Sequence, residues 1–474
     1  MPAYNLEPFV YTLGLIGIVI IISALFSGAI QKLRVPEMAV FLGLGALIGP
    51  AGFQFIDAGV HSPILHIVST LSLALVLFTD AVSLDLKEVR EHKRLAFLTL
   101  GPGTILTAVL IAVLAWRMLH LPPAAAAILG AALASTDPVL LRSFLRCPGL
   151  DPTVRQALRL ESGMNDAVLL PLVLAAIATI TVGHMQAGDW LHLAFNELVL
   201  SPAIGAAVAG AAIGLLTFMR SRTGVRRDYE SIYSLGVAFA AFAGAEAFHG
   251  SGFLAAFAAG LTISAVDVEL CDCFLEYGET TAEMALLFTF VLFGASVIWT
   301  GIGVLSPTTL AFTGLVFLAR PAAFLPALVP APAAWRSRFL IAWFGPRGLS
   351  SLLLVLLAVF ANVPGATELI SVCSLVVLCS IVVHGFSPIL LPKSSAGPQQ
   401  PPAPESPEFL TLDDYRGALA AGTPVTVVDA RSERGFEESD EAPVESVRIH
   451  PDHPVTDARA LGLPRENLLA VLCA

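Results

Sequence analysis

Charged side chains are scarce in this sequence. Only 13% of its 474 residues are Asp, Glu, Lys or Arg, whereas a soluble globular domain carries about 25%. Hydrophobic residues make up 56% of the chain, and the mean hydropathy is +0.79. This composition argues against a water-soluble protein and indicates that a lipid bilayer surrounds most of the chain.

The sequence also lacks a basic surplus and an organised set of cysteines. The net charge is −11, and residues 394–474 alone hold 14 acids against 6 bases. The acidity therefore belongs mainly to the C-terminal segment, and it implies no nucleic-acid partner. The six cysteines have neither metal-site spacing nor the pattern of a disulfide framework, so we expect no cofactor.

Thirteen stretches of the chain are candidates for membrane spans, which need about 17–25 mostly apolar residues. The first stretch lacks the basic start and the cleavage site of a signal peptide, so we interpret it as a span. We expect an all-α membrane protein in which the seventh span links two inverted six-helix repeats. The spans lie near residues 10–30, 35–52, 63–85, 95–119, 122–142, 157–182, 197–220, 229–248, 252–266, 280–299, 304–329, 337–360 and 366–391.

The basic residues predict the orientation of these spans, because Lys and Arg concentrate in cytoplasmic loops. With the N-terminus outside, 17 of the 20 bases in the first 393 residues fall on the cytoplasmic side. The exceptions are Arg117, Arg320 and Arg347. We therefore expect a multi-pass protein of the cell membrane with a cytoplasmic C-terminus.

A few ionisable residues lie inside the predicted spans, where each costs about 2.5–3.5 kcal/mol on insertion scales and suggests a function. The densest group opens the sixth span, where Ser162 and Asp166, and Glu161 and Asn165, lie four residues apart on one side of a helix. A helix N-terminus with dipole-complementing acids would explain Glu161. It would not explain Asp166, because residues 167–180 continue apolar. The full set is Asp80, Asp137, Glu161, Asp166, Glu246, Arg320 and Arg347, of which we interpret Glu246 and Arg320 as structural.

Two predicted spans are interrupted by proline. The fifth contains Ser135-Thr136-Asp137-Pro138, and the twelfth contains Gly345-Pro346-Arg347-Gly348. Proline removes a backbone donor and clashes with the preceding turn, so both helices should break there. Either break alone could be a simple kink. Breaks in the fifth helix of each half, however, point to a transporter's ion site near the midplane of the membrane.

These motifs resemble those of the monovalent cation:proton antiporter-1 family, the NhaP-like sodium/proton exchangers, over residues 10–391. The resemblance is carried by 136–138, 161–166 and 345–348, with looser support from 77–80 and 290–295. It implies a homodimer in which a core domain moves like an elevator against a dimerisation domain. It also implies that Asp166 binds cation and proton in turn, that Ser162 and Thr136 add oxygen ligands, and that Asp137 balances the half-helix ends. Glu161 would pair with Arg347, with Asn165 positioning both.

One position departs from this family pattern. Many relatives have a glutamate directly after Leu-Phe in the third span, whereas this chain has Thr79 there and Asp80 one residue later. That residue lies about 100° further around a helix. We therefore treat Asp80 and Thr79 as weaker candidates for ion binding.

A buried carboxylate favours its neutral form, so protons and sodium would compete for Asp166. Because Asn165 cannot ionise, we expect electroneutral exchange of one cation for one proton, with sodium favoured over lithium or potassium. Two alternatives stay open. One is a channel or non-transporting sensor on the same scaffold, and the other is a membrane-anchored sulfurtransferase.

The C-terminal segment suggests the second alternative. Residues 392–409 read as a proline-rich linker. Residues 410–474 resemble the first part of a rhodanese-like domain, with a helix at 412–420 and strands at 425–428 and 468–472. Asp429 and Arg431 would lie at a strand end, and Cys473 at the place of the sulfur-carrying cysteine. The amides that should follow such a cysteine and cradle its thiolate are missing, so we expect this segment to be inactive and not well folded.

Overall fold

The computed structural model separates into two compact units, residues 1–394 and 395–474, which we describe separately. It describes residues 37–390 except 51, 55–58, 85, 146–149, 184–185, 224, 226, 267–278 and 332, together with residues 17, 21, 425–429, 446–449, 461–462 and 468–472.

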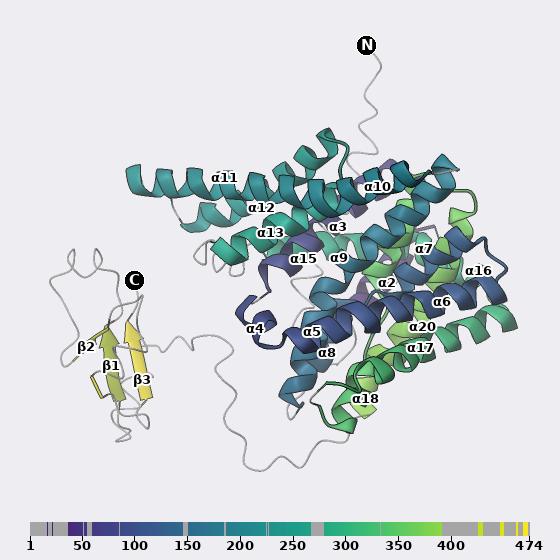
Figure 1. Ribbon diagram of the computed structural model, residues 1–474. Helices are drawn as coiled ribbons and strands as arrows, with labels where there is room; N and C mark the ends of the chain where they lie inside the picture. The colour runs from purple at the N-terminus through teal and green to yellow at the C-terminus, as the bar shows by residue number, and fades with distance from the viewer. Residues whose placement is uncertain are drawn as a thin grey trace. The chain divides into compact units, whose positions relative to one another are not determined.

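The first unit is entirely helical in its described part (Figure 1). Its first half contains α2 (Glu37–Ile48), α3 (Pro63–Val82), α4 (Leu86–Glu91), α5 (Lys93–Leu98), the π-helical turn η1 (Thr99–Gly103), α6 (Thr104–Met118), α7 (Pro123–Ala134), α8 (Pro138–Leu145) and α9 (Pro152–Val182). Then follow α10 (Ala187–Phe195), the π-helical turn η2 (Asn196–Leu200), α11 (Ser201–Arg222), α12 (Arg227–Ala247) and α13 (Gly252–Val266). The last helices are α15 (Glu279–Ala295), η4 (Val297–Trp299), α16 (Thr300–Gly303), α17 (Pro307–Ala327), α18 (Trp335–Trp343), α19 (Leu349–Phe360) and α20 (Ala366–Leu390).

Seven of the described helical segments are long and apolar enough to cross a membrane, or eight if the bent pair at residues 284–303 counts as one span. The predicted ranges from 35–52 to 366–391 each contain a helix or a broken pair of helices. The predicted span at 10–30 lies outside the described residues, except for positions 17 and 21. The chain is therefore a multi-span helical membrane protein, and the count of thirteen stays a prediction.

Small residues let some helices pack with their backbones close together. Gly45 of α2 faces the backbone of Val291 in α15, and a Cβ atom at Gly45 would collide with that carbonyl oxygen. Figure 1 shows α11, α12 and α13 running side by side, whereas α6 and α17 form a second neighbouring pair.

Both predicted helix breaks are confirmed. The helix α7 ends at Ala134 and α8 begins at Pro138, and α18 ends at Trp343 and α19 begins at Leu349. The two extended segments between them meet, since the Asp137 N–H donates a hydrogen bond of 2.9 Å to the carbonyl oxygen of Pro346. The candidate site lies at this crossing.

The described part of the second unit is a parallel three-stranded sheet in the order β2-β1-β3, formed by β1 (Val425–Asp429), β2 (Val447–Arg448) and β3 (Leu468–Leu472). The two predicted strands are confirmed, and β2 is a third strand that we did not predict. The predicted helix at 412–420, Arg431 and Cys473 lie outside the described residues.

Candidate functional site

The carboxylate of Asp137 holds the two helix breaks together. One oxygen accepts hydrogen bonds from the N–H groups of Val139 (2.8 Å) and Leu140 (3.1 Å), at the start of α8. The other accepts from the N–H of Leu349 (2.6 Å), at the start of α19. Helix N-termini carry unpaired N–H groups and partial positive charge, so one carboxylate serves both. The family resemblance implies that Asp137 balances the half-helix ends, and this role stays a prediction.

Arg347 places a positive charge at the C-terminal end of α7. Its side chain is buried, and one guanidinium nitrogen donates to the carbonyl oxygens of Ala134 (2.9 Å) and Ser135 (2.8 Å) at the end of α7. Helix C-termini carry unpaired carbonyls and partial negative charge. The backbone N–H of Arg347 donates to the hydroxyl oxygen of Ser380 (2.7 Å) on α20.

Asp166 lies beside these breaks on α9, with 3% of its surface exposed. Its Oδ1 atom accepts a hydrogen bond of 2.5 Å from the hydroxyl of Ser135. Ser350, the second residue of α19, lies close to the same carboxyl group. The Oδ2 atom of Asp166 is buried and has no hydrogen-bond partner among the described residues. A buried carboxylate oxygen of this kind can accept a proton or a small cation.

Glu161 pairs with Arg320 and not with Arg347, so the predicted ion pair is wrong. Two nitrogens of Arg320 donate to the two oxygens of Glu161 at 3.0 and 3.1 Å. The physical reason is that the donors of Arg347 satisfy carbonyls at the end of α7, while α17 brings Arg320 to Glu161. Arg320 also donates to the Ile341 carbonyl (3.2 Å). Our structural interpretation of Arg320 therefore understated its place in this cluster.

Asn165 and Thr136 connect the ion pair to the first break. The amide nitrogen of Asn165 donates to the Thr136 carbonyl (3.3 Å) and to Glu161 (3.4 Å). Asn165 thus links Glu161 to the first break, whereas we expected it to position Glu161 and Arg347. The Thr136 hydroxyl donates to Glu161 (3.0 Å) and accepts from Arg320 (2.9 Å). The Oδ1 atom of Asn165 is buried without a partner in the described part of the chain.

The remaining candidates make few contacts with this cluster. Ser162 is buried on α9, and its hydroxyl donates to the Arg159 carbonyl one turn earlier (3.3 Å). The buried Thr79 hydroxyl of α3 has no hydrogen-bond partner among the described residues. Asp80 is half-buried on the last turn of α3. In the second unit, Asp429 is buried and lies 3.5 Å from the guanidinium of Arg448.

Sequence reasoning missed Ser135 and Ser380, the two hydroxyl groups that hold Asp166 and the Arg347 backbone. Ser135 belongs to the motif at 135–138 and could have been found, because its hydroxyl directly precedes the break. Ser380 lies 33 residues beyond Arg347, and no spacing rule connects them.

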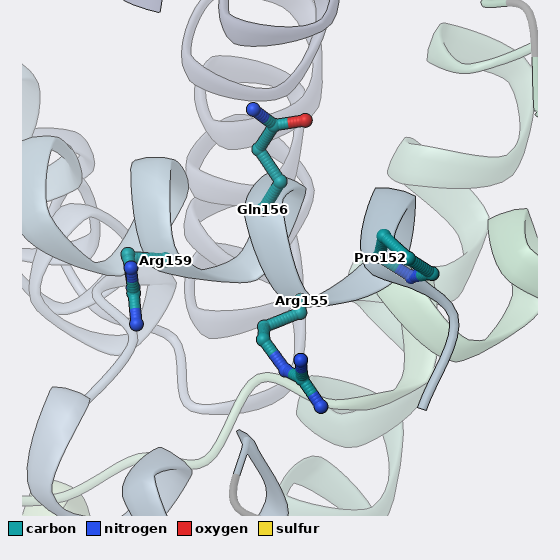
Figure 2. Close-up of a pocket in the computed structure, with 4 residues that line it drawn as sticks. All are labelled: Pro152, Arg155, Gln156 and Arg159. Carbon is teal, nitrogen blue, oxygen red and sulfur yellow. The ribbon is translucent and has the colours of Figure 1, made fainter. Parts of the chain in front are cut away.

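A separate basic pocket lies at the start of α9, lined by Pro152, Arg155, Gln156 and Arg159 (Figure 2). Arg155 donates to the carbonyl of Leu145 (3.2 Å). None of the cluster around Asp166 lines this pocket.

Comparisons with known proteins identify the family. Residues 19–391 match the family described as "Sodium/hydrogen exchanger, transmembrane". The chain is 26% identical over 393 residues to the K(+)/H(+) antiporter NhaP of Alkalimonas amylolytica, covering 82% of this chain and 66% of that protein. It is also 26% identical over 394 residues to the Na(+)/H(+) antiporter NhaG of Bacillus atrophaeus, covering 78% and 72%. The chain thus spans a little under two thirds of the length of the first curated relatives, such as NhaP2 of Shewanella sp. strain MR-4, at 64%.

The fold is similar to that of the sodium proton antiporter MjNhaP1 from Methanocaldococcus jannaschii. The TM-score is 0.67 at 18% sequence identity, and the match covers 81% of this chain and 98% of that structure. The resemblance predicted from the motifs is therefore confirmed. Because the family match covers most of the sequence, the chain belongs to the sodium/hydrogen exchanger family.

Proposed function

We propose that this chain is a secondary active antiporter, not an enzyme, which exchanges one monovalent cation for one proton at Asp166. The observation that carries the proposal is the Oδ2 atom of Asp166, which is buried where two broken helices meet and has no hydrogen-bond partner among the described residues. Irregular backbone at membrane depth is tolerated where it is buried in protein or lines a cavity. At transporter midplanes such breaks form the ion site.

The charges around Asp166 support exchange of one for one. Asp137, Glu161 and Asp166 are carboxylates, and Arg320 and Arg347 carry guanidinium groups. With all five ionised, the cluster has one net negative charge, which either one proton or one monovalent cation neutralises. The chain can then carry Asp166 through the membrane in a neutral complex in both directions.

Oxygen donors near Asp166 are the proposed ligands of the cation. Small hard cations prefer oxygen. Besides Asp166, we propose the Ser162 hydroxyl and the Thr136 carbonyl as direct ligands. Asp137 acts mainly through its charge, because both of its oxygens already accept backbone N–H groups. Thr79 and Asp80 on α3 are the weaker members of this set.

The relatives' names support a monovalent cation without choosing one. They include antiporters of potassium and of sodium. We propose sodium as the substrate, with potassium and lithium as the ions to compare. We further propose a homodimer in the cell membrane, with thirteen spans in two inverted repeats, the N-terminus outside and the C-terminus in the cytoplasm.

For the second unit we propose a partial rhodanese-like segment at 410–474 behind a linker at 392–409. The parallel pairing of β1 with β3, and the buried Asp429 at the end of β1, support an α/β segment of this kind. We propose no sulfurtransferase activity for it.

The test of the exchange proposal uses the full chain in proteoliposomes with an imposed pH gradient and a trapped pH dye. Addition of sodium should collapse the gradient, and Asp166→Asn should abolish the response because it removes the titrating group. Glu368→Gln is the matched control, since it removes an exposed carboxylate at the start of α20. Exchange that persists unchanged in Asp166→Asn would refute the assignment.

A further inference from the structure

His384 is a buried histidine that the proposed exchange cycle does not use. It lies on α20 with 6% of its surface exposed. Its ring is edge-on to Phe317 of α17, with 5.4 Å between ring centroids. It is also 6.1 Å from the ring of Trp343, the last residue of α18. His384 therefore sits where the second broken helix is interrupted.

Ser380 links this histidine to the break. Its hydroxyl oxygen accepts a hydrogen bond of 2.7 Å from the backbone N–H of Arg347 and lies 3.2 Å from Nδ1 of His384, one turn along α20. The N–H groups of a broken helix segment lack intrahelical partners, and a buried unpaired one costs about as much as a lost hydrogen bond. The Ser380 hydroxyl supplies the partner for Arg347 from another helix.

From Arg347 the contacts continue to Asp166. The Arg347 guanidinium donates to the carbonyls of Ala134 and Ser135, and the Ser135 hydroxyl donates to Asp166. We infer that Ser380 and His384 are positioning residues that fix the second helix break and, through Arg347 and Ser135, the geometry of the ion-binding carboxylate. The inference rests on the proposed function and adds to it two residues on α20.

The hydrogen-bonding capacities of these groups explain why a histidine suits this place. Ser380 uses an oxygen lone pair for the Arg347 N–H, so its own proton is free to point at Nδ1 of a neutral imidazole. This arrangement requires the tautomer whose ring proton lies on the other nitrogen, Nε2. This arrangement directs the lone pair of Ser380 at Arg347.

Aromatic rings and a hydroxyl group surround His384. Phe317 and Trp343 pack against its ring, and the Ser380 hydroxyl lies 3.2 Å from Nδ1. We therefore assign His384 a positioning role, in which Nδ1 accepts the proton of Ser380.

The test compares sodium-dependent exchange by the full chain and its variants in proteoliposomes, with potassium as the probe if the wild type exchanges only that ion. His384→Leu removes the acceptor at nearly constant side-chain length, whereas His384→Asn keeps an oxygen where Nδ1 lies. Ser380→Ala removes the hydroxyl. Ser371→Ala is the matched control, because Ser371 is also buried on α20 and its hydroxyl donates to a carbonyl of the same helix, that of Thr367.

We expect His384→Leu and Ser380→Ala to raise the half-saturating cation concentration about 3- to 10-fold, the size of one lost hydrogen bond. His384→Asn should recover most of the difference, and Ser371→Ala should match the wild type. If His384→Leu does not fold, Ser380→Ala carries the same comparison.

The inference is overturned if both substitutions leave the half-saturating concentration unchanged. It is equally overturned if they lower only the maximal rate and the unfolding temperature, because that pattern indicates a merely structural role. A wild-type protein without exchange would instead refute the proposed function.

Discussion

At the residue scale, each buried charged side chain in the cluster forms hydrogen bonds or ion pairs with specific neighbouring groups. Asp137 satisfies backbone N–H groups and Arg347 satisfies carbonyls, while Glu161 and Arg320 neutralise each other. Burying an ion costs several kcal/mol even after relaxation, so removing one partner of a buried pair leaves an uncompensated charge. Among these three carboxylates, only Asp166 has an oxygen without a hydrogen-bond partner in the described residues.

Arg320→Met should therefore destabilise the protein by about 3–5 kcal/mol, because Glu161 would lose both charge-assisted hydrogen bonds. The measurement is the thermal unfolding temperature of the purified protein in detergent. Arg222→Met, at an exposed position near the end of α11, should leave the unfolding temperature almost unchanged.

The double variant Arg320→Met with Glu161→Gln distinguishes pairing from packing. It removes the stranded charge, so it should recover part of the stability lost in Arg320→Met. A double variant as unstable as the sum of the two single variants would show that the pair does not couple, contrary to the 3.0 Å contact.

The sequence predicts separate roles for Asp166 and Asn165, because only Asp166 can ionise and each lies four residues after a polar neighbour, Ser162 or Glu161. It could not identify the arginine that reaches Glu161. Arg320 and Arg347 are both lone charges in apolar spans, and the choice between them depends on how α17 and the α18–α19 break pack against α9. That packing is a tertiary property without a local signal.

At the scale of secondary-structure elements, the crossing of the two breaks organises the site. Glycine is needed there because the backbone segments approach charged side chains closely. A Cβ atom added at Gly348 would collide with the Asp137 carboxylate, and one at Gly345 would collide with the Arg320 guanidinium.

Gly348→Ala should thus lower both the unfolding temperature and the exchange rate, because the Asp137 carboxylate must move away from the N–H of Leu349. Gly314→Ala is the control, since nothing lies within 4 Å of a Cβ atom at that position of α17. Alanine is favoured over glycine in a helix by about 1 kcal/mol, so Gly314→Ala should be neutral or stabilising. A Gly348→Ala protein with wild-type stability and rate would contradict the role of the crossing.

The breaks themselves could be predicted from proline alone, because Pro138 and Pro346 each remove a backbone donor. Their meeting in space could be inferred only from their corresponding places in the two halves. The sheet of the second unit could be predicted only in part. Its strands β1 and β3 follow from runs of Val and Leu, whereas the short strand β2 has only two residues and gives no usable pattern.

At the scale of the whole molecule, the five buried charged side chains around Asp166 lie together at the crossing of the two helix breaks, among apolar residues. The cluster draws on α9, α17 and both breaks, while helices such as α11 present apolar side chains on their exposed faces. A single net negative charge in such surroundings is costly unless a proton or a cation accompanies it.

Exchange should therefore displace no net charge per turnover. With Asp166 occupied by either a proton or a monovalent cation, the cluster is neutral when it crosses in each direction. A membrane potential acts on transport at about 2.3 kcal/mol per elementary charge per 100 mV, so a neutral cluster leaves the cycle insensitive to voltage. The measurement is charge displacement on a solid-supported membrane, with the same proteoliposomes assayed in parallel for proton movement. Proton exchange without a sustained current supports the one-for-one cycle, and a current that scales with the exchange rate would show that a second charge moves with Asp166.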